Sequence, residues 1–196
     1  MNYYRAKLLN AVLLFCSKTK RCNTTKLLKL LAFLDFTHFK QTGYPSLGLD
    51  YYSWKHGPVP KSFYEEIKGG NVPTDFEDRL AAIPQTWNSE NSDVTEYIYT
   101  VKPKAKVDVS IFTPREMQII DLLCDIYHEA TASQMSEVSH LHRSPWDTTV
   151  KNKGYYKRID YLLCIDDESP LKVDDAIEKI REHTEMLGNF KVSSSD

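Results

Sequence analysis

The sequence predicts an α+β fold, a predominantly helical single domain with a small antiparallel β element. Three observations predict it. Several segments repeat apolar residues at helical spacing, short stretches are aromatic or alternate between polar and apolar residues, and glycine and proline separate these segments. With 196 residues, of which 41% are hydrophobic, the chain can bury one sizeable core.

The first two helices are expected within the first 43 residues. Residues 4–18 place apolar side chains on one side and Arg5 and Lys7 on the other. A second helix should start after a cap at Thr24 or Thr25 and end at Gly43, because glycine readily adopts the left-handed conformation of a helix stop. This helix is apolar nearly all round, so we expect it to be central.

The middle of the chain should hold the β structure. Residues 45–56 are interpreted as a turn and a strand that Gly57 and Pro58 break, before a short helix over 62–68. Residues 71–93 are polar and irregular, which is typical of a loop excursion. Residues 95–101 and 107–112 both alternate, which predicts a β-hairpin between them.

Helices are again expected towards the C-terminus. Thr113, Pro114 and Glu116 form a strong helix start, and a second helix should cover Ser133 to His140. A last helix is expected from Val173 to Leu187. The predicted domain covers residues 1–190, and residues 191–196 are expected to be a flexible tail. Apolar residues recur along the last helix in a heptad-like pattern, at Val173, Ile177, Ile180, Thr184 and Leu187.

Composition narrows the class of protein. A formal charge of -2 gives no global reason to expect a nucleic acid or a membrane partner. The four cysteines are scattered, and three of them lie in apolar runs, which is typical of reduced core cysteines. We therefore expect a cytoplasmic protein.

Motifs for catalysis are missing from the sequence. It contains no glycine-rich phosphate loop, no GxSxG and no HExxH, so we expect no enzyme, no catalytic residue and no cofactor. One zinc site is conceivable at Cys124, His128, His140 and His142. Because Cys124 belongs to an apolar helical stripe, no metal is expected there.

A nucleic-acid partner is possible but not favoured. Residues 115–141 could form a helix-turn-helix, yet the second helix carries no Lys or Arg. Residues 151–158, "KNKGYYKR", interleave cations with tyrosines that could stack on bases. The simpler interpretation is that the basic segments are solvated loops.

Three blocks of the sequence carry a family resemblance. They are an apolar helix that contains "KLL" and ends in glycine, then "WKHGPV", and later a Ser-His…Pro-Trp element. This order resembles the Panacea, or SocA-like, antitoxin domain of bacterial and phage proteins. The basic segment after His140 and the polar region 71–93 depart from the family pattern. The matching positions are Lys29, Leu30, Leu31, Gly43, Tyr52, Trp54, His56, Gly57, Pro58, Val59, Ser139, His140, Pro145 and Trp146.

The resemblance implies a non-enzymatic antitoxin that neutralises a cognate toxin by direct binding. It also leaves open a proteolytic adaptor that presents its toxin to a ClpXP-type protease. Two further alternatives stay open: a DNA-binding transcriptional regulator that uses the 115–141 helix pair, and a phage interaction protein that redirects a host protein.

The stretch "YYSWKHGPVPKSFYEEI" (residues 51–67) has two possible roles. Trp54 and the Gly57–Pro58 turn are expected to pack against the second helix, with the other motif residues, His56, Val59, His140 and Trp146, serving structure or binding. Tyr52, Lys55, Lys61 and Tyr64 are expected on the opposite side, as a partner-binding surface.

Overall fold

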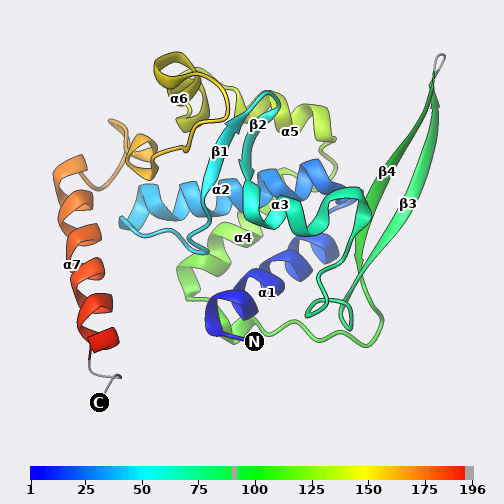
Figure 1. Cartoon of the computed structure of the whole chain (residues 1–196), viewed down its shortest axis with the longest axis horizontal. Helices are drawn as coiled ribbons and strands as arrows, with labels where there is room; N and C mark the ends of the chain where they lie inside the picture. Colours follow the sequence, from blue (N-terminus) through cyan, green and yellow to red (C-terminus); the bar gives the residue numbers. More distant parts are fainter. Residues whose placement is uncertain (90–91, 193–196) are drawn as a thin grey trace.

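A computed structural model describes residues 1–89 and 92–192; at 87–89, 92–94, 183 and 186–192 it describes the backbone alone. The fold is α+β and mostly helical, as predicted (Figure 1). Its elements in chain order are α1 (Tyr3–Lys18), α2 (Thr24–Thr42), β1 (Tyr51–Trp54), β2 (Gly57–Pro60), α3 (Lys61–Ile67), β3 (Leu80–Ser89), β4 (Ser92–Val101), α4 (Pro114–Ile126), α5 (Ala132–Ser139), α6 (Pro145–Lys153) and α7 (Val173–Val192), with short 3-10 turns at Lys68–Gly70, Val109–Ile111 and Tyr161–Cys164.

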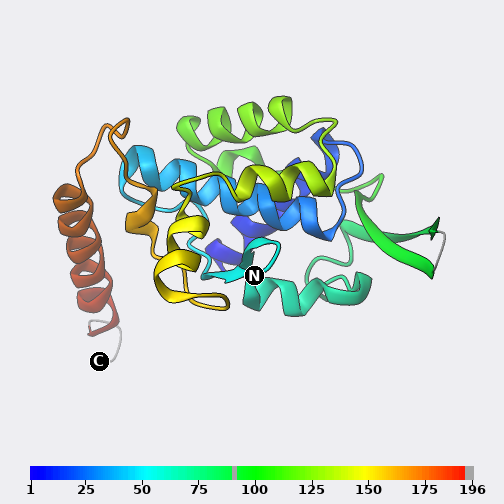
Figure 2. The same ribbon diagram turned by 90° about the horizontal axis from the view of Figure 1, so that it is seen from above.

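Helix α2 is the centre of the fold. Helices α1, α4 and α5, the β1–β2 hairpin and the turn at Tyr161–Cys164 all pack against it (Figures 1 and 2). The side chain of Asn23 caps its start by accepting from the backbone N–H of Lys26, so the cap precedes the predicted threonines. Its end at the left-handed Gly43, with φ of 83°, is confirmed.

The β1–β2 hairpin corrects the predicted strand at 45–56. Strand β1 ends at Trp54, and Gly57 and Pro58 begin the returning strand instead of breaking the sheet. On the other edge of β1, the N–H of Ser53 donates to Lys157 O at 2.9 Å, and the N–H of Ile159 donates to Tyr51 O at 2.8 Å. Strand β2 is thereby left at an edge, where prolines are tolerated.

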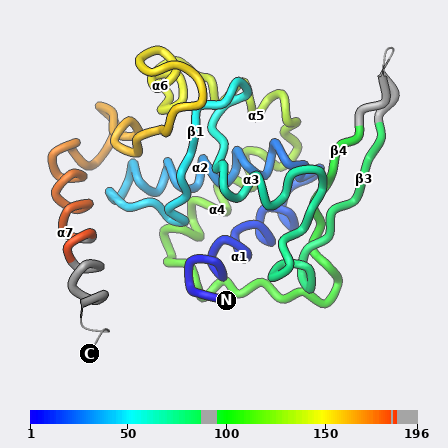
Figure 3. The backbone as a smooth tube through the Cα atoms, viewed as in Figure 1, coloured from blue at the N-terminus to red at the C-terminus, as the bar shows by residue number. Residues whose placement is uncertain are grey.

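The β3–β4 hairpin contradicts two predictions. Residues 80–89 of the predicted loop 71–93 form β3, which pairs with β4, and residues 107–112 lie around a 3-10 turn instead of in a strand. The hairpin extends away from the helices (Figure 3). Strand β3 contains Pro84, which its place in the ladder tolerates. The N–H of Tyr99 points away from β3, because it donates to the carbonyl of Cys22. Two residues along β4, Tyr97 is paired with Pro84, and the backbone nitrogens of this pair also point away from the ladder. Pro84 therefore costs the hairpin no hydrogen bond.

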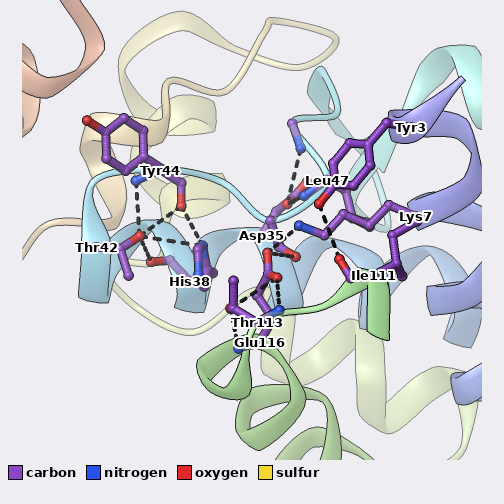
Figure 4. Close-up of polar contacts among 12 residues, drawn as sticks. Tyr3, Lys7, Asp35, His38, Thr42, Tyr44, Leu47, Ile111, Thr113 and Glu116 are labelled. Carbon is purple, nitrogen blue, oxygen red and sulfur yellow. Dashed lines mark hydrogen bonds and ion pairs between the residues drawn. The ribbon is translucent and has the colours of Figure 1, made fainter. Parts of the chain in front are cut away.

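Buried polar contacts fix α2, α4 and the loop after α2 (Figure 4). Asp35 accepts hydrogen bonds from the backbone N–H of Leu47 at 2.5 Å and from the hydroxyl groups of Tyr51 and Tyr161 at 3.0 and 3.1 Å. Lys7 pairs with the buried Glu116 at 2.6 Å. Glu116 also completes the predicted capping box at the start of α4.

Helix α7 is longer than the predicted helix from Val173 to Leu187. It continues to Val192, so residues 191 and 192 of the predicted flexible tail are helical, and residues 193–196 lie outside the described residues. The cysteines at 16, 22, 124 and 164 are free thiols. Cys124 and Cys164 are buried, as expected from their apolar runs, whereas Cys16 is half-buried and Cys22, outside such a run, is buried.

Candidate partner-binding face

The motif residues of α2, β2 and α5 meet in one place. The ammonium group of Lys29, only 1% exposed, donates to the carbonyl of Pro58 at 3.1 Å. A Cβ atom on Gly57 would lie 2.3 Å from Ser139 Oγ and 2.6 Å from Lys29 Nζ, and the φ of Gly57 is +104°. Glycine is therefore required at 57 by both the space and the backbone conformation.

A second set of motif contacts ties β1 to α6. The indole N–H of Trp146 donates to the carbonyl of Trp54 at 2.8 Å. The ring of His140 stacks on Trp146, with centroids 3.9 Å apart and an interplanar angle of 17°. These contacts join the ends of α5, α6 and the hairpin across the central helix. We call Lys29, Gly57, Pro58, Ser139, His140 and Trp146 the motif brace.

Burial governs the titratable groups of the motif brace. Desolvation lowers the pKa of Lys29 from 10.5 to about 7. Burial also lowers the pKa of His140, and the nearby charges of Lys29 and His56 add to this. The Nε2 atom of His140 is buried and has no hydrogen-bond partner among the described residues. Burial in the brace therefore disfavours the charged forms of Lys29 and His140.

Exposed aromatic rings lie on the outer side of the brace. Trp54 contacts Tyr64 edge-on at 4.9 Å between ring centroids, and Tyr156 lies 6.1 Å from Trp54. Tyr155 and Tyr156 are 47% and 57% exposed. We name this surface, formed by Tyr52, Trp54, Lys55, Lys61, Tyr64, Tyr155 and Tyr156, the aromatic–basic face.

The predicted separation of Trp54 from Tyr64 and Tyr52 is wrong. Side chains alternate along a strand, so residues 52 and 54 share one side of β1. Tyr51 and Ser53 are the buried pair, while Tyr52 and Trp54 are half-buried on the outer side. Phe63, on α3, is buried in the core. Trp54 therefore belongs to the candidate face together with the residues predicted for it.

The charge on this face is positive. The nearby carboxylates are already engaged: Glu66 pairs with Arg5, Glu65 with Lys68 and Asp50 with Arg158. Among the described residues, no carboxylate lies within ion-pair distance of the exposed ammonium groups that we list next. They are Lys55 and Lys61.

Part of the face was missed as a partner-binding site. Residues 155–157 approach β1 through the bond from Tyr156 N–H to Ser53 O at 2.8 Å. Tyr156 adopts a φ of 61°, which is uncommon for a residue other than glycine. The alternation of cations and tyrosines in "KNKGYYKR" was visible in the sequence, but only the fold places it beside the hairpin.

The other candidate sites are dispersed. Cys124 is buried on α4, the carbonyl of His128 accepts from Lys26, and His140 lies on Trp146. Within the searched part of the chain, which excludes the masked residues, no group of three or more metal-ligating side chains could hold an ion. The absence of zinc stays a prediction.

Helices α4 and α5, the predicted helix pair, both pack mainly on α2. The exposed side of α5 carries Ser133, Gln134 and Glu137 and no cation. It therefore offers DNA phosphates no attraction. In the described part of the chain, no helix is both long and apolar enough to span a membrane.

Comparison with known families places the protein. The family model described as "Antitoxin SocA-like, Panacea domain" matches residues 27–147, which include every residue of the motif brace. The protein is thus of the antitoxin-like class. It belongs to the SocA-like Panacea family, which suggests a role in a toxin–antitoxin system. Comparisons with curated proteins and with solved structures gave no match.

Proposed function

We propose that the protein is an antitoxin that neutralises a cognate toxin by direct binding, without catalysis, and that the aromatic–basic face contacts the toxin. The observation that carries the proposal is the gathering of half-exposed aromatic rings and unpaired lysines on one rigid surface beside the family motif. Aromatic side chains are typical anchors of protein interfaces.

The charge of the face sets the chemistry of the partner. With Asp50, Glu65 and Glu66 already paired, the ammonium groups of Lys55 and Lys61 favour an acidic protein surface. Such complementarity speeds association and fixes orientation. The buried Lys29 and His140 have structural contacts, and we assign them no chemistry on the toxin.

The motif brace has a separate role in this proposal. It fixes β1, α5 and α6 relative to α2, so the rings of Trp54 and Tyr156 are held in place before binding. An interface that is ordered in advance loses less conformational entropy on association. Family residues thus support the surface, and the segment after residue 147 completes it.

The test is co-expression with the neighbouring gene product, followed by gel filtration of the purified mixture. We expect toxicity to be abolished and a stoichiometric complex to form. A double variant, Lys55→Glu with Lys61→Glu, should lose both, while the exposed Lys104→Glu keeps both. Rescue at sub-stoichiometric amounts without any complex would contradict direct binding, as would binding of single-stranded nucleic acid in place of the toxin.

A further inference from the structure

Helix α7 is seated on the body along one narrow side. Ala176 is fully buried and packs in a cluster with Phe39 and Cys164. The ammonium group of Lys179 donates to the carbonyl of Thr42 at 3.0 Å, at the end of α2. The rest of the helix stands at the margin of the molecule, separate from the other helices in both views (Figures 1 and 2). Its position is therefore fixed at one side while the other side faces solvent.

Partly exposed apolar residues line the edge of α7 next to this seated side. Val173, Ile177 and Ile180 are 43%, 47% and 38% exposed, and Thr184 follows on the same line. Their spacing alternates between four and three residues, which is the repeat of a two-helix seam. Exposed apolar residues at this repeat are unusual for a helix that only faces water.

The charges beside the stripe differ in sign along the helix. Asp174 lies next to Val173, and Arg181 lies two turns later, next to Ile180; both are exposed. Arg181 makes a long contact of 3.5 Å with Glu178 of its own helix, with both side chains largely exposed. Such a contact contributes little, so Arg181 can turn to another carboxylate.

We propose that the α7 stripe binds the same stripe of a second copy of this chain, with the two helices antiparallel. Ile177 of each copy packs against Ile180 of the other. In this register Asp174 of each copy lies beside Arg181 of the other, which gives two ion pairs per dimer. A parallel pair instead brings Arg181 towards Ala176, which has no charge and is already buried against the body. The charges therefore select the antiparallel arrangement.

This inference is independent of toxin binding, because α7 lies beyond the matched residues 27–147 and away from the aromatic–basic face. Few apolar layers are buried, so the dimer should be moderate, with a dissociation constant on the order of micromolar. An antitoxin dimer of this kind presents two aromatic–basic faces.

Sedimentation equilibrium of the full chain alone, over a concentration series, tests the proposal. Ile177→Glu should abolish the dimer without lowering the melting temperature, since Ile177 is exposed in one copy. Asp174→Arg alone should weaken the dimer about 10-fold, which is the scale of a well-formed charge pair turned repulsive. The same holds for Arg181→Asp.

The combination of Asp174→Arg with Arg181→Asp should restore the wild-type constant, because each new charge again meets its opposite. Glu182→Arg, on the side of α7 away from the stripe, is the matched control and should change nothing. A wild-type monomer at all concentrations overturns the proposal. A dimer that Ile177→Glu leaves intact overturns it too. If the double exchange fails to restore the wild-type dissociation constant, the antiparallel register is excluded.

Discussion

Replacing Lys29 by Met should stabilise the protein, although Lys29 belongs to the family motif. Lys29 is 1% exposed, and the carbonyl of Pro58 is its acceptor, so its charge is poorly compensated. Methionine has a similar length and fills the same space without a charge.

The magnitude follows from the lowered pKa. The pKa of Lys29 is about 7 in the folded protein against an ordinary value of 10.5. Each pKa unit corresponds to about 1.4 kcal/mol, so keeping Lys29 protonated in the core below pH 7 costs about 5 kcal/mol. The lost bond to the Pro58 carbonyl offsets about 1 kcal/mol of the gain. We expect Lys29→Met to raise the unfolding free energy by about 2–4 kcal/mol at pH 7.

The sign of the pH dependence is also fixed. Between pH 7 and 10.5 the unfolded chain binds more protons at Lys29 than the folded chain does. Wild-type stability from this group should therefore rise with pH, by up to about 1.4 kcal/mol per pH unit above pH 7. The variant lacks this slope. Its advantage over wild type should thus shrink by about 2 kcal/mol between pH 7 and 8.5.

Lys26 is a matched control on the same helix. It is equally buried, but its ammonium group donates to three carbonyls, those of Lys20, His128 and Ala130, at 2.8, 3.1 and 2.9 Å. Lys26→Met leaves the carbonyls of Lys20 and Ala130 without the donor they have now, while the carbonyl of His128 keeps the backbone N–H of Lys20, and the change should destabilise the protein. Urea unfolding of both variants at pH 6–8.5 is the assay. Equal destabilisation by both, with unchanged pH slopes, would refute the reasoning.

Three more substitutions probe the brace, the buried ion pair and the face. Gly57→Ala should cost more than about 2 kcal/mol because its Cβ overlaps two side-chain atoms, while Gly69→Ala, with open space around it, should cost about 1 kcal/mol; equal losses in thermal melts would contradict the close packing. Glu116→Gln should cost about 3 kcal/mol at pH 7 by leaving Lys7 buried and unpaired. Burial opposes the ionised form of Glu116, but bonds from Lys7 and Thr113 leave its pKa below the ordinary value of 4.5. Its contribution is therefore fully present above pH 4.5 and is lost as the pH falls through the lowered pKa; acid unfolding that the variant leaves unchanged would count against this. Trp54→Ala should lower the unfolding free energy by about 2 kcal/mol, less than the loss of a fully buried tryptophan, and should also weaken toxin binding. An unfolded variant would contradict the half-exposed position of Trp54 and show that it is a core residue.

Local chemistry made most helices predictable, although α6 (Pro145–Lys153) was not among those expected. The end of α2 at Gly43 needs only a left-handed residue after an apolar helix, and the start of α4 needs only Thr113 and Glu116 three residues apart. The class and the motif positions followed from equally local patterns. These elements are fixed by residues within one or two helical turns.

The β structure depended on partners distant in the chain. The alternation of residues 95–101 predicts strand β4, but its partner is expected on the wrong side, because residues 71–93 are polar and irregular. Whether a proline fits in a strand depends on which edge its nitrogen faces, and the edge is set by the contact between Tyr99 and Cys22. No local pattern carries that information.

The candidate face shows the same division. The sequence predicts a partner-binding surface on the hairpin and the following helix, at Tyr52, Lys55, Lys61 and Tyr64. It places Trp54 on the opposite side, although side chains two residues apart in a strand, such as those of Tyr52 and Trp54, lie on the same side. The contribution of residues 155 and 156 arises from hydrogen bonds between segments about a hundred residues apart, such as that from Tyr156 N–H to Ser53 O. A sequence can flag such a segment, but it takes the fold to join it to the hairpin.

The central claim is that the aromatic–basic face binds an acidic surface of the toxin. Isothermal titration of the purified toxin into wild type, the double variant Lys55→Glu with Lys61→Glu, and the control Lys104→Glu tests it most directly. We expect a dissociation constant at least about 100-fold larger for the double variant, no change for the control, and wild-type affinity that falls as salt is raised. Melting temperatures should stay unchanged, since the replaced side chains are exposed. Wild-type affinity in the double variant would contradict the claim.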